Sequence, residues 1–257
     1  MKKLSAIVLA GVLALAATGC GSGDDTTKGR TLTVLAASSL TGTFTDLASQ
    51  FEAAHHGVRV RLVFGSSATL AQQTTEHAPG DVLATADQKT MDDAVSGGGI
   101  KGKPTQFATN VVVVAVPADN PAHVSTFADL DRAGVDYLTC VPTAPCGAAA
   151  EALLAKAGIS RKPASQEVDV KSVLAKVVAG EADAGLVYRT DVTASGGKVT
   201  GIDIPDAASS PNTYWLGVTA KGHEAADGGA LATQWIEFLT SSEGQAVLKA
   251  AGFGTVG

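Results

Sequence analysis

The amino-acid sequence predicts an α/β protein built as two lobes. Short apolar runs alternate with segments whose apolar residues recur at helical spacing, a pattern typical of parallel sheets flanked by helices. The alternation is interrupted by the glycine-rich segment 97–104 and then starts again. A β-branched run at 110–116 and a late apolar run at 214–219 suit a chain that crosses twice between two lobes. We therefore expect each lobe to be a mostly parallel sheet with helices on its faces.

The first half of the chain predicts three strand–helix units. The apolar run 31–36 (TLTVLA) is the first strand, and the helix 39–55 carries its apolar residues on one face. The run 58–64 (VRVRLVF) alternates with period two, which predicts a strand with one polar face. The remaining elements expected here are a helix over 69–76, a strand over 81–85 and a helix over 88–95.

The second half opens with the most β-branched run of the chain, NVVVVAV at 110–116, which predicts a strand buried on both faces. The elements expected after it are helices over 126–133, 147–157, 171–179, 228–239 and 242–251, and strands over 136–140, near Val168, and over 184–188, 199–204 and 214–219. From this order we assign residues 31–110 and 217–257 to lobe I and residues 111–216 to lobe II.

The start of the chain predicts export. Lys2 and Lys3 precede an apolar stretch, 4–17, that is shorter than the roughly 20 residues a bilayer span needs and is typical of a secretory signal peptide. The stretch ends in ATGC, which resembles the lipobox of bacterial lipoproteins, whose cysteine becomes the lipidated first residue; here that is Cys20. We expect residues 1–19 to be removed and residues 20–30 to form a lipidated, flexible tether at the outer face of the cell membrane, periplasmic or at the cell surface. An ordinary cleaved signal is the alternative.

The composition and the cysteine count exclude further classes of protein and of site. A net charge of -6 argues against a nucleic-acid partner, and 45% hydrophobic residues argue against disorder. With Cys20 lipidated, Cys140 and Cys146 remain as a pair, for which a disulfide is the default outside the cytoplasm. A zinc site would need more ligands nearby. A catalytic Cys146 is the remaining alternative, because a helix start favours the thiolate.

Three strand-to-helix junctions are rich in glycine or small hydroxyl residues: 36–40, 64–70 and 144–148. The first turn of a helix has four unpaired N–H groups and a partial positive charge, which together suit an anion. Ordinary N-capping by serine is the alternative for each junction taken alone. The segment 97–104 nearly matches a phosphate-binding loop, but Pro104 stands where the motif needs Ser or Thr, so we expect a flexible turn there.

Several motifs, in this order along the chain, carry a family resemblance: AASSL (36–40), FGSSATLAQQ (64–73), GDVLATADQKTMDDAV (80–95), VPTAPCGAAAEALL (141–154), VDVKSVLAKV (168–177) and AGLVYRTDV (184–192). With them the sequence resembles the molybdate-binding proteins of ABC-type uptake systems over nearly all of residues 31–257. These proteins have the two-lobed fold of periplasmic solute-binding proteins of type II, with the ligand in the cleft between the lobes. The resemblance implies no enzymatic activity and no cofactor.

In that family the oxyanion is held by neutral donors, and the motifs place them here at the hydroxyls of Ser39, Ser67 and Tyr188 and the main-chain N–H groups of Cys146 and Val170. Whether Ser38 or Ser39, and Ser66 or Ser67, faces the ligand stays open. The resemblance also implies molybdate or tungstate as ligand, without a direct metal ligand. It further implies a monomer and, as partners, a membrane permease with its ATPase. The alternatives are another tetrahedral oxyanion such as sulfate, a secreted hydrolase using Ser39, Ser67 or Cys146, or a surface adhesin.

Overall fold

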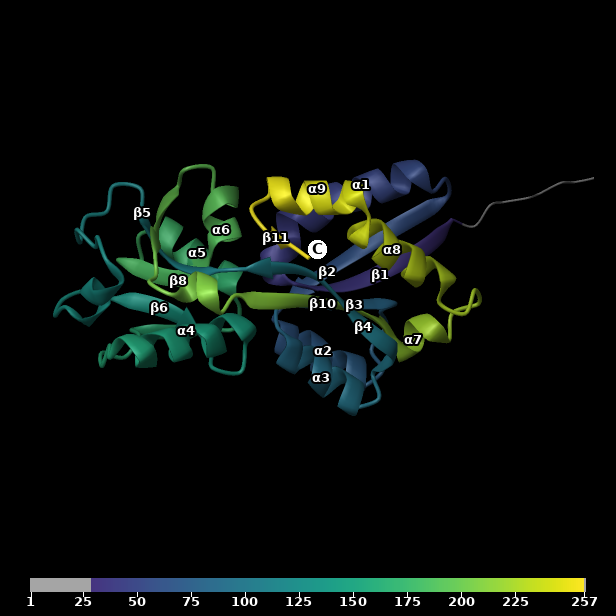
Figure 1. Ribbon diagram of the computed structural model, residues 1–257, viewed down its shortest axis with the longest axis horizontal. Helices are drawn as coiled ribbons and strands as arrows, with labels where there is room; N and C mark the ends of the chain where they lie inside the picture. Colours follow the sequence, from purple (N-terminus) through teal and green to yellow (C-terminus); the bar gives the residue numbers. More distant parts are fainter. Residues whose placement is uncertain (1–28, 257) are drawn as a thin grey trace, which may run out of the picture.

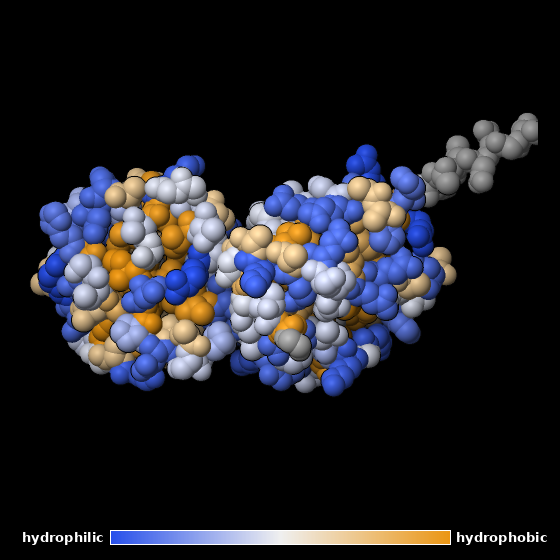
Figure 2. All heavy atoms as spheres, turned by 45° about the horizontal axis from the view of Figure 1, so that its top comes forward, coloured by the Kyte–Doolittle hydropathy of each residue, from blue (hydrophilic) through white to orange (hydrophobic). Residues whose placement is uncertain are grey.

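A computed structural model describes residues 29–256 of the chain. The predicted signal peptide (1–19), Cys20 and the tether up to residue 28 lie outside the described residues. Two α/β lobes lie side by side along the long axis of the molecule (Figure 1). In a space-filling view they meet across a narrow waist (Figure 2). The predicted two-lobed α/β class is therefore confirmed. No helix within residues 29–256 is long and apolar enough to cross a membrane.

Lobe I has a six-stranded sheet with the strand order β11-β4-β10-β3-β1-β2. Helices α1, α8 and α9 cover one face of this sheet, and α2 and α3 cover the other (Figure 1). The elements of lobe I are β1 (Arg30–Ala37), η1 (Ser38–Leu40), α1 (Thr41–Ala54), β2 (Val58–Gly65), α2 (Ser67–Thr75), β3 (Val82–Thr85), α3 (Gln88–Ser96), β4 (Ile100–Asn110), β10 (Asn212–Thr219), α7 (Ala220–His223), α8 (Ala230–Thr240), α9 (Ser242–Ala250) and β11 (Gly254–Thr255).

Lobe II has a five-stranded sheet with the strand order β7-β6-β8-β5-β9, and helices lie on both of its faces (Figure 1). Its elements are β5 (Val112–Pro117), η2 (Phe127–Asp131), β6 (Tyr137–Cys140), α4 (Pro145–Ala157), β7 (Ser165–Glu167), α5 (Val170–Val178), β8 (Ala184–Tyr188), α6 (Arg189–Ala194), β9 (Val199–Asp203) and η3 (Ala207–Ser209).

Both sheets are more mixed than the sequence predicts. Strand β1 pairs in parallel with β2 and β3, and β6 pairs in parallel with β7 and β8. The strands next to the two crossings, β4, β5, β9 and β10, pair antiparallel with their neighbours instead. Only Val111 separates β4 from β5, so a nearly continuous extended segment runs from one lobe into the other.

The second crossing lies earlier than the sequence suggests. Strand β10 pairs with β4 from its first residue, with Asn212 opposite Asn110. Residues 212–216, which we assigned to lobe II, are therefore in the sheet of lobe I. The apolar pattern becomes clear only from Tyr214 onward, because the polar residues Asn212 and Thr213 begin the strand.

The glycine-rich segment 97–104 is mostly strand, not a flexible turn. Strand β4 begins at Ile100, and its pairing with β10 slips between Leu216 and Val218, where β4 bulges. Gly102 has a φ of 74°, which glycine adopts without strain, and such bulges tolerate both glycine and proline. Strand β11 pairs only with Ala108 and Thr109, so the bulge also lies at the edge of the sheet.

Each lobe has its own hydrophobic core. In lobe I, Trp235 of α8 packs edge-on against Phe44 and Phe51 of α1, with ring centroids 5.7 and 5.2 Å apart. In lobe II, the predicted β-branched strand is buried along its whole length as β5, with valine side chains on both faces. Two separate cores allow each lobe to stay rigid while the crossings between them bend.

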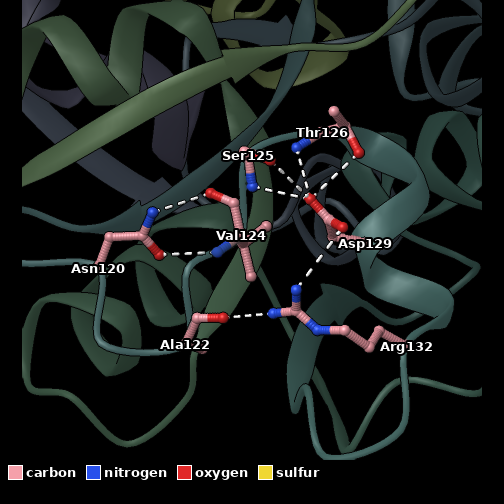
Figure 3. A network of polar contacts seen from close by, with 7 residues as sticks. All are labelled: Asn120, Ala122, Val124, Ser125, Thr126, Asp129 and Arg132. Atoms are coloured by element: carbon pink, nitrogen blue, oxygen red, sulfur yellow. Dashed lines mark hydrogen bonds and ion pairs between the residues drawn. The ribbon is translucent and has the colours of Figure 1, made fainter.

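The helix expected over 126–133 is a shorter 3-10 helix, η2, and a polar network caps its start (Figure 3). One carboxylate oxygen of Asp129 accepts hydrogen bonds from the backbone N–H groups of Ser125 and Thr126, both at 2.8 Å, and from their hydroxyls at 3.1 Å. Arg132 donates to the Ala122 carbonyl and pairs with Asp129. These hydrogen bonds favour the charged carboxylate, and the backbone donors of Ser125 and Thr126 are the largest cause that lowers the pKa of Asp129 to about 2.

Candidate functional site

A small cavity lies between the lobes, at the ends of strands from both sheets. Lobe I lines it with the residues that follow β1, β2 and β3, and lobe II lines it with the starts of α4 and α5 and the end of β8. All five residues predicted from the sequence lie in its wall. The full lining is Ala37, Ser38, Ser39, Gly65, Ser66, Ser67, Ala86, Ala144, Pro145, Cys146, Asp169, Val170 and Tyr188.

Ser39 lies in the short 3-10 turn η1 that joins β1 to α1, and its side chain is buried. Its hydroxyl forms a hydrogen bond of 2.8 Å with the hydroxyl of Tyr214, which belongs to β10. Ser38 is buried to the same degree and lines the same cavity. The sequence did not indicate Tyr214, because it stands 175 residues away along the chain.

Ser67 is the first residue of α2, and only 2% of it is exposed, whereas Ser66 is half-buried. The Ser67 hydroxyl accepts a hydrogen bond of 3.0 Å from the backbone N–H of Ala86, which follows β3. A serine oxygen that already accepts a hydrogen bond keeps its own hydrogen free to donate. This arrangement favours Ser67 over Ser66 as the hydroxyl that donates into the cavity.

Lobe II presents the starts of two helices. Cys146 is the second residue of α4, after Pro145, and Val170 is the first residue of α5. Their N–H groups belong to helical first turns, which have no intrahelical acceptor and lie at the positive end of the helix dipole. Asp169 also lines the cavity, but its carboxylate caps α5 by accepting a hydrogen bond of 2.9 Å from the N–H of Ser172.

A disulfide joins Cys140, at the end of β6, to Cys146, with their Cα atoms 5.7 Å apart. The bridge confirms the predicted pairing and ties the start of α4 to the neighbouring strand. It also removes the thiol that a catalytic Cys146 would need.

Tyr188 ends β8 and is 1% exposed. Its hydroxyl is buried and has no hydrogen-bond partner within residues 29–256. Burial, with smaller contributions from Tyr214, Asp87 and Asp191, raises the pKa of Tyr188 well above its usual value, so the hydroxyl keeps its hydrogen. A protonated hydroxyl without a partner in the wall of a cavity can donate a hydrogen bond to a ligand.

An ion pair ties the two donor segments of lobe II together. Asp191 is fully buried and accepts the N–H of Tyr188 at 3.1 Å, and its other carboxylate oxygen lies 2.9 Å from Nζ of Lys171, the residue after Val170. Burial raises the pKa of Asp191, and Lys171 opposes that rise. The charge of Lys171 is therefore directed at Asp191, which leaves the cavity lined mainly by neutral donors.

The cavity is suited to a small anion held by hydrogen bonds. Three residues with hydroxyl groups and two helix starts line one space, and hydrogen bonds to a charged acceptor are stronger than neutral ones. Nowhere in the described part of the chain do three His, Cys, Asp or Glu side chains group as a metal site would require. Catalysis by serine would need a base, and the carboxylate in the wall, Asp169, is engaged as a helix cap.

Two α/β lobes with such a cavity between them are typical of solute-binding proteins. Comparison with known proteins agrees with this class. The chain belongs to the family of bacterial extracellular solute-binding proteins, whose model matches residues 32–254. This family consists of binding proteins and not of enzymes.

Two relatives in sequence cover almost the whole chain. The molybdate-binding protein ModA of Mycobacterium tuberculosis is 38% identical over 257 residues, which cover 97% of this chain and 95% of the relative. A putative ABC transporter substrate-binding lipoprotein of Bacillus subtilis, YvgL, is 30% identical over 260 residues, which cover 98% of each chain.

Two solved structures share the fold. The periplasmic molybdate-binding protein of Azotobacter vinelandii matches with a TM-score of 0.75 and 22% identity, over 88% of this chain and all of the other. The sulfate-binding protein SubI of Mycobacterium tuberculosis also matches with a TM-score of 0.75, at 20% identity, over 88% of this chain and 87% of the other. At such identities the likeness concerns the fold alone.

Proposed function

We propose that this protein captures molybdate, and also tungstate, outside the cytoplasm and delivers it to an ABC importer. The observation that carries the proposal is that the five residues expected to donate hydrogen bonds line one small cavity between the lobes: Ser39, Ser67, Cys146, Val170 and Tyr188. The relative from Mycobacterium tuberculosis, named as a molybdate-binding protein, supports the choice of anion. A net-negative protein can bind an anion in this way, because local donors outweigh a distant net charge.

The protonation of the anion decides part of the specificity. Molybdate is a dianion without hydrogens, so every oxygen can accept from a donor in the wall. Hydrogen phosphate carries an O–H that would meet another donor and remain unpaired in a buried site, which weakens its binding. Tungstate is nearly the same size as molybdate and carries the same charge, so we expect both to bind.

Sulfate is the second candidate ligand. It has the charge and shape of molybdate but shorter bonds, so cavity size alone can reject it. A sulfate-binding protein has the same fold, so the fold is compatible with this alternative. In either case the anion bridges both lobes only when they close, so binding shifts an equilibrium between open and closed forms.

Delivery requires partners outside this chain. The closed form would dock on a membrane permease whose ATPase drives import, and the protein would act as a monomer. Lipid at Cys20 would hold it at the outer face of the membrane, on a tether that includes residues 21–28. The description of the Bacillus subtilis relative as a lipoprotein supports this anchor. Mass spectrometry of the membrane-bound protein, with Cys20→Ser as control, tests it: an unmodified Cys20 would refute the anchor.

Calorimetric titration of residues 21–257 with molybdate, tungstate, sulfate and phosphate tests the function. We expect tight one-to-one binding of the first two anions and weak or silent titrations with the others. Tight sulfate binding would keep the class and change the solute. Silence with all four anions would overturn the proposed function.

A further inference from the structure

Tyr214 does not line the cavity, yet it contacts the site from behind. It is fully buried in β10, where its ring packs edge-on against Phe107, Tyr188 and Phe253. Its hydroxyl reaches Ser39 at 2.8 Å. Either oxygen of this pair can be the donor, so the role of Ser39 toward a ligand depends on which one is.

The neighbouring Asn110 favours one direction. The backbone N–H of Val111 can only donate, and it contacts Oδ1 of Asn110 at 2.9 Å, which fixes the orientation of the amide. Nδ2 therefore faces the other way and donates to Oγ1 of Thr190 at 2.8 Å and to the hydroxyl oxygen of Tyr214 at 3.4 Å. Accepting this hydrogen occupies one lone pair of the Tyr214 oxygen, which favours donation of its own hydrogen to Ser39, 2.8 Å away.

The hydrogen bonds then run in one direction, from Asn110 through Tyr214 to Ser39. Burial raises the pKa of Tyr214, so its hydroxyl keeps the hydrogen that it donates. With its oxygen accepting from Tyr214, Ser39 has its own hydrogen left for the cavity. Ser67 is in the same state, because the N–H of Ala86 donates to its oxygen.

We propose that Tyr214 is a positioning residue that, through Ser39, makes the site a donor of hydrogen bonds only and so selects oxyanions without hydrogens. This inference rests on the proposed function. A serine hydroxyl without such a partner can rotate and either donate or accept, so it could accommodate the O–H of hydrogen phosphate. A serine whose hydroxyl is fixed as a donor cannot accept a hydrogen bond from that O–H.

A double-mutant cycle between Tyr214→Phe and Ser39→Ala tests the inference by calorimetry. We expect Tyr214→Phe to weaken molybdate binding about three- to tenfold, the range of one ordinary hydrogen bond, and to lower the ratio of molybdate to phosphate affinity. In the Ser39→Ala background the same substitution should have no further effect, because its route to the anion is gone. Equal losses in both backgrounds, or an unchanged ratio, would overturn the inference.

Controls separate this result from a loss of structure. Tyr137→Phe removes the hydroxyl of another buried tyrosine, which donates to the Arg161 carbonyl at 2.6 Å in lobe II away from the cavity, and should leave molybdate affinity unchanged. Thermal unfolding of each variant shows whether it folds. If Tyr214→Phe does not fold, Asn110→Ala removes the group that orients Tyr214, and its effect must also vanish in the Ser39→Ala background. A wild-type protein silent to every anion would overturn the proposed function, whereas a binding wild type with equal losses would overturn only this inference.

Discussion

The two lobes supply donors to the cavity in different ways. Lobe I offers the side-chain hydroxyls of Ser39 and Ser67, and each has a hydrogen-bond partner behind it, the Tyr214 hydroxyl or the Ala86 N–H. Lobe II offers mainly the main-chain N–H groups at the starts of α4 and α5, whose directions the helices set. The difference teaches that a rotatable hydroxyl needs a fixed partner to act as a donor, whereas a helix start needs only the helix.

The largest expected effect removes one hydroxyl from each lobe. Ser67→Ala combined with Tyr188→Phe should weaken molybdate binding by about a hundred- to ten-thousandfold, since each hydrogen bond to a charged group contributes about 1.5–3 kcal/mol. Calorimetric titration measures the loss. Ser160→Ala with Tyr137→Phe removes the same atoms outside the cavity and should leave affinity unchanged. An unaffected double variant in the cavity would place the site elsewhere.

The next effect tests whether lobe II acts through its main chain. Val170→Pro deletes the N–H, and proline fits the first position of a helix. Asp169 before it is already extended, with φ -153° and ψ 169°, as a residue before proline must be. We expect binding about ten- to a hundredfold weaker than in Val170→Ala, which trims the side chain but keeps the N–H. Equal affinities of these two variants would assign the donors of lobe II to other groups.

A smaller effect concerns the bridge at the start of α4. Replacing Cys140 and Cys146 together with alanine should lower the free energy of unfolding by about 2 kcal/mol, because the bridge closes a short loop in the unfolded chain. Urea unfolding measures this difference, and a reductant should lower the stability of the wild type but not of the variant. Anion affinity should fall modestly, because the alanine at position 146 still has the main-chain N–H and only the rigidity of the bridge is lost. A loss as large as that of Val170→Pro would mean that the bridge itself positions the donor.

The smallest expected effect is on the stability of lobe II and does not involve the cavity. The lowered pKa of Asp129 means that its network stabilises the fold above about pH 4, the unfolded value, and that this contribution is lost as pH falls through about 2. Asp129→Asn should therefore lower the unfolding temperature at pH 6, and the difference from wild type should shrink toward pH 2. Asp119→Asn, an exposed change in the same loop, serves as control. A difference that persists at pH 2 would assign the effect to shape and not to charge.

Much of this arrangement could be predicted from the sequence because the signals are local. Ser39, Ser67 and Cys146 lie at three junctions between strands and helices that the local pattern indicates, whereas Val170 and Tyr188 are implied only by the family resemblance. The structure brings all five to one cavity. That they bind an oxyanion stays a prediction. The disulfide follows from the cysteine count and the compartment.

The rest depends on contacts between distant segments. The sequence pattern does not predict the first part of β4, which lies in a glycine-rich stretch, because the bulge breaks the alternation of side chains. The link of Tyr214 to Ser39 spans 175 residues, and no motif reports the direction of a hydrogen bond. The apolar pattern puts the second crossing later than the structure does, because the polar residues Asn212 and Thr213 begin the strand.

A residue that serves a ligand through its backbone has a side chain available for a second task. Cys146 uses its sulfur for the bridge to Cys140, and Val170 buries its side chain in the core of lobe II. Over evolutionary time such positions can exchange residues without loss of the N–H. We expect relatives that keep the ligand to vary more at 146 and 170 than at Ser39, Ser67 and Tyr188. A search that demands identity at all five positions would therefore overlook true members, whereas one that demands the three hydroxyls and two helix starts would find them.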